Sequence, residues 1–300
     1  MIAEMIKPAI PKAGGTVVLV APSSPANNPG DIDFAVMHLE NMGFNVKEGR
    51  GLRQARGYLA GDDDVRAADI NNAFADPDVS GIFAFRGGYG AARILDKIDY
   101  GNIRVNPKFF CGFSDTTALH LAITKFARVI TFHMPFISPR LAVCKYSRNC
   151  ADKFLFNENF SYSLSNPKDN PWRFLSPGTA AGPLIGGNLS VIASLMATAY
   201  EIDTAGKIVF LEDVGEEPYR VDRMLTQLKM AGKFDRCAGV VFGDFAGCDA
   251  AEIAEIAAGL DLHVPVLFNF AIGHCFPTAS LPIGAMGRIS STENSFSITI

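Results

Sequence analysis

The run from Thr16 to Ala21 limits the choice of fold more than any other stretch of this sequence. Its residues are apolar and mostly β-branched, and Pro22 ends it. A strand without polar alternation is typical of a parallel sheet that is covered on both faces. A helical stretch that Asp31 would cap and Gly43 would end follows, and then a second strand. We therefore predict a βαβ unit and an α/β fold with a parallel sheet.

A glycine-rich turn follows the third predicted strand, residues 81–85. It contains Arg86, Gly87 and Gly88 and leads into a helix. Free backbone N–H groups in such a turn can bind a phosphate, a carboxylate or an oxyanion. The turn lacks the G-x-G-x-x-G spacing and the lysine of a P-loop, so we do not expect a dinucleotide or nucleoside triphosphate there. A plain tight turn is the alternative.

The next predicted strand ends at Gly112, and Ser114 and Asp115 then open a helical segment. A serine on a sharp turn between strand and helix can project its hydroxyl beyond the strand. Ser114 is therefore the candidate nucleophile, although a helix cap formed by Ser114 or Asp115 is the simpler interpretation of these residues alone. Because neighbouring parallel strands place their end loops along one crevice, we expect Gly87 and Ser114 to lie together.

A serine nucleophile needs a base to take its proton and an acid to orient that base. His274 follows an apolar strand and occupies a turn, so it is a candidate base, with a hydrogen-bonded turn histidine as the alternative. His133 also ends a strand and competes with it. Glu212 ends the predicted strand 207–211 and is the candidate acid, and Asp213 could replace it.

Charge and cysteine spacing exclude several classes of function. A net charge of −4 without a basic stripe argues against nucleic acid as a partner. No apolar run approaches the ~20 residues of a membrane helix, and the amino terminus lacks a basic start before an apolar core. The six scattered cysteines form no CxxC pair and H-E-x-x-H is absent, so we expect no metal and no cofactor. Such thiols suit a reducing cytoplasm. Cys111 and Cys275 rank well below Ser114 as nucleophiles.

The chain of 300 residues is long enough for two domains. Regular patterning fades between Pro139 and Pro183, where prolines interrupt aromatic residues. We predict an interdomain connection there that packs against the protein, because a free linker would be more polar. The predicted domains are 1–165, with the nucleophile, and 166–300, with the glutamate and the histidine.

Five blocks of the sequence, in order and spacing across nearly the whole chain, resemble the LD-carboxypeptidase family. They are Arg86–Leu95, Gly112–Leu119, Gly186–Leu189, Leu211–Leu225 and Gly273–Gly284. Five blocks in register are far more specific than any single motif. One departure is His133-Met134-Pro135, where many relatives carry His-Gly-Pro.

The resemblance implies a cytoplasmic serine peptidase that works without metal. Its Ser-Glu-His triad falls here on Ser114, Glu212 and His274. It further implies a parallel-sheet α/β domain at the amino terminus, a smaller α/β domain at the carboxyl terminus, an active site at their interface, and a homodimer.

The same resemblance implies removal of the terminal D-alanine from murein tetrapeptides during cell-wall recycling. The alternative is hydrolysis of microcin-type aminoacyl-nucleotides. The compact chain favours the first activity, and Trp172 keeps the second open. A third hypothesis is a non-catalytic protein that binds a phosphorylated ligand, but it leaves Glu212 and His274 unexplained.

Two substrate contacts follow from the proposed chemistry. The backbone N–H groups of Asp115 and of Gly87 or Gly88 are the candidate oxyanion hole. An exopeptidase must also bind a free carboxylate, and arginine suits that task. Arg86 is the first candidate and Arg220 the second. For both, a structural ion pair is the alternative, with Asp115 as the partner of Arg86 and with Asp222 or Glu217 as the partner of Arg220.

Overall fold

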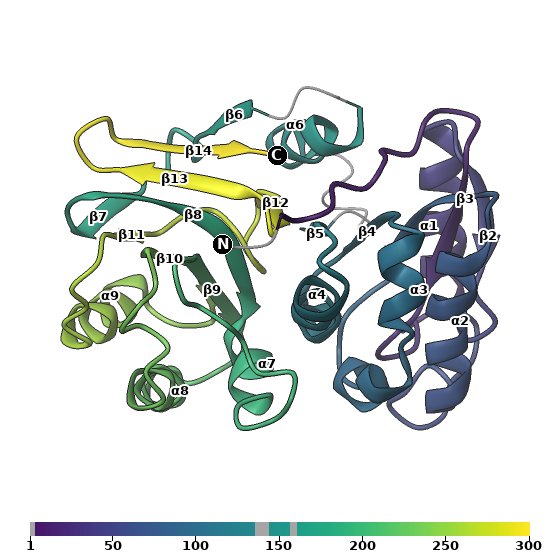
Figure 1. Ribbon diagram of the computed structural model, residues 1–300, viewed down its shortest axis with the longest axis horizontal. Coiled ribbons are helices and arrows are strands. Elements are labelled where there is room, and N and C mark those ends of the chain that lie inside the picture. Colours follow the sequence, from purple (N-terminus) through teal and green to yellow (C-terminus); the bar gives the residue numbers. More distant parts are fainter. Residues whose placement is uncertain (1–3, 136–143, 157–160) are drawn as a thin grey trace. The chain divides into compact units, whose positions relative to one another are not determined.

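The computed structural model describes residues 4–135, 144–156 and 161–300. The chain forms two compact units, residues 1–158 and 159–300 (Figure 1). Both units are built from strands and helices, which confirms the predicted α/β class. The assignment of the nucleophile to a domain 1–165 and of the acid and base to a domain 166–300 stays a prediction.

The first unit contains five parallel strands in the order β5-β4-β3-β1-β2. Their bounds are β1 Thr16–Val20, β2 Asn45–Glu48, β3 Val79–Ala84, β4 Phe109–Gly112 and β5 Thr131–His133. All four residues of β4 and five of the six in β3 are buried. This burial on both faces explains why these strands show no polar alternation.

The first unit also contains α-helices, two 3₁₀ helices (η1 and η2) and one π-helix (η3). They are α1 Pro29–Asn41, α2 Asp63–Ala75, η1 Ala91–Lys97, α3 Tyr100–Val105, η2 Ser114–Thr116, α4 Thr117–Ala122, η3 Ile123–Ala127 and α6 Lys145–Leu155. Helix α1 begins before the expected cap. Asp31 lies in its first turn and accepts a hydrogen bond from the backbone N of Asn28 at 3.2 Å. No helix among the described residues is long and apolar enough to cross a membrane.

The second unit contains an eight-stranded mixed sheet in the order β6-β14-β13-β8-β9-β10-β11-β7. Its strands are β6 Ser161–Leu164, β7 Arg173–Ser176, β8 Thr179–Asn188, β9 Ile208–Val214, β10 Gly239–Ala246, β11 Val266–Phe268, β13 Met286–Ser290 and β14 Ser295–Thr299, and the short β12 is Leu281–Ile283. Strands β8 to β11 are parallel to one another, and β6, β7, β13 and β14 pair antiparallel with their neighbours.

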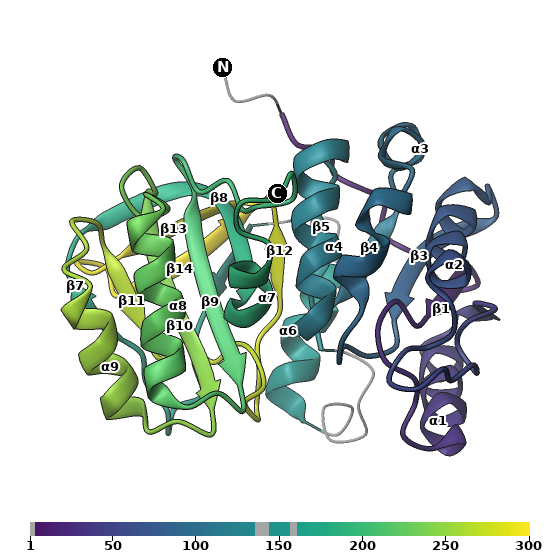
Figure 2. The same cartoon turned by 90° about the horizontal axis from the view of Figure 1, so that it is seen from below.

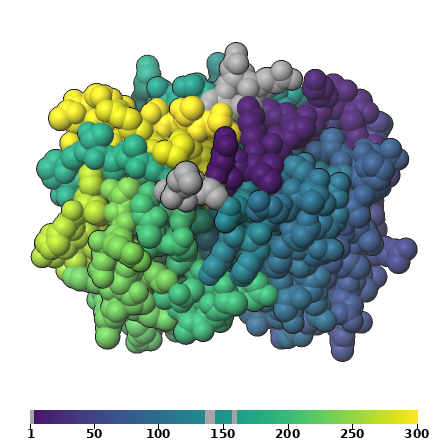
Figure 3. Space-filling view, viewed as in Figure 1, coloured from purple at the N-terminus to yellow at the C-terminus, as the bar shows by residue number. Residues whose placement is uncertain are grey.

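Three helices of this unit, α7 Leu189–Ser194, α8 Pro218–Met230 and α9 Ala250–Gly259, lie on one face of β8–β11 (Figures 1 and 2). The hairpin β13–β14 reaches the surface, as the yellow atoms in Figure 3 show. Phe296 and Ile298 on β14 are nonetheless fully buried. The hairpin therefore contributes one side to the core of the unit.

The prediction of an irregular connection over residues 139–183 was wrong for the described part of that stretch. It contains α6, β6, β7 and the first half of β8. Pro167, Pro171 and Pro177 lie between these strands, where a missing N–H interrupts no ladder. Strands of four residues separated by prolines are too short to show a clear period. Pro139 lies outside the described residues.

Candidate active site

Ser114 lies on a sharp turn between β4 and the helical residues that follow. Its φ is +61°, a left-handed conformation that is uncommon for any residue except glycine. Gly87 packs directly against it, since a Cβ added there would lie 2.6 Å from Ser114 Cβ and 2.8 Å from Oγ. The structure therefore brings together the glycine turn and the predicted nucleophile, as expected from adjacent parallel strands.

The Asp115 carboxylate is buried and is bound by two other loops. Its Oδ2 accepts hydrogen bonds from Ser23 Oγ at 2.6 Å and from the backbone N of Ala91 at 2.8 Å. Burial raises the pKa of Asp115, while these two bonds and the charge of Arg66 act in the opposite direction. The side chain thus joins the loops after β1 and β3, and a helix cap is not its role.

The turn 86–90 is held against the loop that follows β1. Gly88 has a φ of +112°, and a Cβ there would collide with the side chain of Ser24. Ser24 Oγ accepts a hydrogen bond from Tyr89 N at 3.1 Å, and Ser24 N donates to Gly87 O at 3.4 Å. A residue with a side chain at position 88 would be both strained and crowded, which accounts for the glycine.

The two candidate arginines have different partners. Arg86 Nη1 donates to the carbonyl of Pro25 at 3.1 Å and to Asn27 Oδ1 at 2.6 Å, instead of pairing with Asp115. Among the described residues, its Nη2 and Nε have no hydrogen-bond acceptor. Arg220 lies 3.7 Å from Glu216, which is not one of the two partners expected from the sequence. Arg220 therefore fits the structural alternative better than Arg86 does.

In the second unit, Glu212 and His274 form a close pair. Strand β9 extends beyond its predicted end and includes Glu212, which is fully buried. His274 Nδ1 lies 2.7 Å from Glu212 Oε2. Gly273, with a φ of +113°, permits this approach, because a Cβ there would lie 2.6 Å from the same oxygen. Glu212 Oε1 is buried without a hydrogen-bond partner among the described residues.

This environment favours the charged form of the imidazole. Burial acts to lower the pKa of His274, but the hydrogen bond and charge of Glu212, with the charges of Asp213 and Asp244, raise it above 6.5 overall. Burial and the charge of Glu212 raise the pKa of Asp244 in turn. An imidazole that Glu212 orients in this way can accept a proton on Nε2.

Asp213, the alternative acid, has other partners. Its carboxylate accepts hydrogen bonds from Asn188 Nδ2 at 3.0 Å, Ser190 N at 2.8 Å and Val214 N at 2.8 Å. It therefore holds the start of α7. Successive side chains of a strand point to opposite faces, which separates Asp213 from the Glu212 side of β9.

The competing base His133 and the thiol of Cys111 are buried, and Cys275 is half-buried. His133 has no exposed surface and packs edge-on against Phe113, with ring centroids 6.3 Å apart. Burial raises the pKa of Cys111 and raises the pKa of Cys275 to about 12, so both thiols stay protonated at neutral pH. In the part of the chain that the structure describes, no group of three or more His, Cys, Asp or Glu residues could hold a metal ion.

Several residues around these groups were not found by sequence analysis. Ser23 and Arg66 form hydrogen bonds to distant parts of the chain, and the charge of Asp244 acts on His274. For Ser23 and Asp244 the available signal was their position at or near the end of an apolar strand. His120 also has a structural role, since its ring nitrogens lie 2.9 Å from Gly112 O and from Thr131 Oγ1. Burial lowers its pKa to about 4.

Comparison with known proteins gives the same result for both halves of the chain. Residues 17–134 match the LD-carboxypeptidase N-terminal domain, and residues 181–289 match the LD-carboxypeptidase C-terminal domain. A probable murein peptide carboxypeptidase from Bacillus subtilis (strain 168) is 40% identical, over 96% of this chain and 92% of its own length. The murein tetrapeptide carboxypeptidase from Pseudomonas aeruginosa is 30% identical, over 90% of this chain and 91% of its own length.

A solved structure shows the same fold over the full length. The MccF-like protein from Bacillus anthracis str. Ames superimposes with a TM-score of 0.89 at 27% identity, covering 98% of this chain and 99% of its own. The protein therefore belongs to the LD-carboxypeptidase family, which is a family of serine peptidases.

Proposed function

We propose that this protein is a serine LD-carboxypeptidase that removes the terminal D-alanine from murein tetrapeptides. The 2.7 Å contact between the buried Glu212 and His274 carries the proposal, because it supplies an oriented base. The strained turn that presents Ser114 supports it from the other unit. The substrate is suggested by the relatives that are named as murein peptide carboxypeptidases.

In the proposed reaction, His274 Nε2 takes the proton from Ser114 Oγ as that oxygen attacks the carbonyl carbon of the scissile bond. Glu212 keeps the Nδ1–H of the ring fixed and stabilises the imidazolium that forms. The N–H groups of Asp115 and of Gly87 or Gly88 bind the oxyanion. His274 then protonates the leaving amine of D-alanine. In the second half of the reaction, His274 takes a proton from the water that attacks the acyl-enzyme and returns it to Ser114 Oγ as the shortened peptide leaves.

Release of D-alanine from a purified murein tetrapeptide tests the proposal directly. Ser114→Ala should reduce kcat by several orders of magnitude while the variant stays folded. A variant that keeps activity within about tenfold of the wild type would refute the role of Ser114. A chelator should leave the wild-type rate unchanged, whereas inhibition that zinc reverses would favour a metallopeptidase.

The MccF-like structure supports a second candidate, hydrolysis of a microcin-type aminoacyl-nucleotide. The two substrates can be compared at equal concentration with the same enzyme preparation. A higher kcat/KM for the tetrapeptide supports the first proposal, and a higher value for the aminoacyl-nucleotide supports the second. Location in the cytoplasm and a homodimer stay predictions. Sedimentation as a monomer at micromolar concentration would contradict the dimer.

A further inference from the structure

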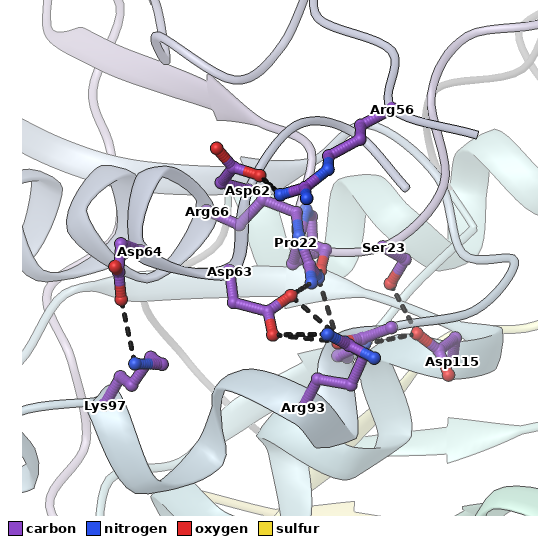
Figure 4. Close-up of polar contacts among 12 residues, drawn as sticks. Pro22, Ser23, Arg56, Asp62, Asp63, Asp64, Arg66, Arg93, Lys97 and Asp115 are labelled. Carbon is purple, nitrogen blue, oxygen red and sulfur yellow. Dashed lines mark hydrogen bonds and ion pairs between the residues drawn. The ribbon is translucent and has the colours of Figure 1, made fainter. Parts of the chain in front are cut away.

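Arg66 on α2 is almost fully buried, with 1% of its surface exposed. Arginine is rarely buried unless its charge is paired. Its Nη2 donates to Asp63 Oδ1, and the same carboxylate accepts three further bonds from Arg93, including Nη2 to Oδ2 at 2.8 Å. Figure 4 shows these three side chains together. The buried charge is therefore compensated at its outer side by a carboxylate that also binds an exposed cation.

The inner side of the guanidinium joins two loops. Nη1 donates to the carbonyl of Pro22, which follows β1, and to the carbonyl of Gly90 at 2.9 Å. Gly90 closes the turn that contains Gly87. One nitrogen thus binds two loops that leave neighbouring strands of the sheet. A hydrogen bond to a charged donor is stronger than one between neutral groups, so this junction is firm.

The residue after each of these carbonyls donates to the same oxygen of Asp115. Ser23 follows Pro22 and donates through Oγ at 2.6 Å, and Ala91 follows Gly90 and donates through its backbone N at 2.8 Å. The contacts of Ser23 with Asp115 are drawn in Figure 4. Asp115 is covalently next to the strained Ser114. Arg66 is therefore connected to Asp115 by two hydrogen-bonded paths, one through Pro22 and Ser23 and the other through Gly90 and Ala91.

We infer that Arg66 is a positioning residue for Ser114, which acts by fixing the two loops that hold the Asp115 carboxylate. The inference rests on the proposed function, because it requires Ser114 to be the nucleophile. If Arg66 only stabilised the fold, the effect of replacing it on kcat would not depend on Ser23. If Arg66 positions Ser114, Arg66 and Ser23 support the same Asp115 carboxylate. The losses of kcat in the two single variants should then not add in the double variant.

The experiment measures kcat and KM for D-alanine release with four variants that circular dichroism shows to be folded. Arg66→Met should lower kcat by about 10- to 100-fold with little change in KM, as expected for a nucleophile displaced by up to about 1 Å. Arg66→Lys should recover part of the loss, because lysine keeps the charge but lacks the fork. Ser23→Ala should also lower kcat. The double variant, Arg66→Met with Ser23→Ala, should have a kcat only slightly below that of the less active single variant.

Arg53→Met is the matched control. Arg53 belongs to the same unit but is exposed, and its side-chain hydrogen bonds to described residues go to Glu48 and Asp33 instead of to either loop. Its kcat should stay within about twofold of the wild type. If Arg66→Met does not fold, the same cycle is measured with Arg66→Lys and Ser23→Ala.

Two outcomes would overturn the inference: a folded Arg66 variant with wild-type kcat, or losses for Arg66 and Ser23 that simply multiply. If Ser114→Ala is inactive in the same assay, either outcome refutes the positioning role and leaves the proposed function standing. If Ser114→Ala is active, the proposed function itself fails.

Discussion

Replacement of Gly87 by alanine should damage catalysis without unfolding the protein. The added Cβ would lie 2.6 Å from Ser114 Cβ, 2.8 Å from Oγ and 3.0 Å from Asp115 N, whereas ordinary contacts begin near 3.4 Å. Ser114 and residue 87 must therefore move apart by about 0.8 Å. Such overpacking costs about 1–3 kcal/mol of stability. A nucleophile displaced by about 1 Å can lose about 100-fold in rate.

The assay is again release of D-alanine, with kcat and KM determined separately and the unfolding temperature measured in parallel. We expect kcat to fall by about 10- to 100-fold and KM to change far less, because the reacting atoms move while the rest of the substrate still binds. Gly30→Ala is the control, since nothing lies within 4 Å of its added Cβ on α1. A folded Gly87→Ala enzyme with the kcat of Gly30→Ala would refute the placement of Gly87 beside a working nucleophile.

Four further predictions concern charge. Because the pKa of His274 is raised above 6.5, kcat/KM should rise with pH through a midpoint above 6.5, and the stability that the pair contributes should be lost as pH rises through the same range. Glu212→Gln should move that midpoint downward, since burial then dominates, and a pH–rate profile shows the shift. Arg86→Ala should weaken cleavage of the tetrapeptide by roughly 1.5–3 kcal/mol and hardly affect a substrate with an amidated carboxyl terminus; equal losses would assign the arginine to the turn instead. The pKa of His120 is lowered to about 4, so stability should fall by up to about 3 kcal/mol between pH 6.5 and 4, and chemical denaturation of His120→Gln should show a smaller fall.

Sequence analysis predicted the parts of this protein that depend on local pattern. The buried strands, the turn at Ser114 and the strand that carries Glu212 each follow from residues that are close in the chain. It failed over the described part of residues 139–183, where it missed helix α6 and where the four-residue strands β6 and β7 are defined only by their partners β14 and β11.

Sequence analysis could not predict contacts between distant loops either, because these contacts leave no local pattern in the sequence. The burial of Arg66 could not be predicted, because Asp63 is its one nearby acceptor and the other two are backbone carbonyls of distant residues, which any sequence supplies. The bond from Ser23 to Asp115 spans 92 positions and requires the strand order β4-β3-β1. The family resemblance supplied the predicted triad as a set, whereas the residues alone left His133 open as the base and Asp213 open as the acid.

The conformation of Ser114 implies a conflict between stability and reactivity at this one position. A left-handed residue with a side chain costs about 1–2 kcal/mol relative to the ordinary helical region, and glycine would avoid most of that cost. Ser114→Gly should therefore yield an inert protein that tolerates higher temperature than the enzyme. Under the proposed function, the hydroxyl is needed for the reaction, which would explain a serine at a position where glycine is the more stable residue.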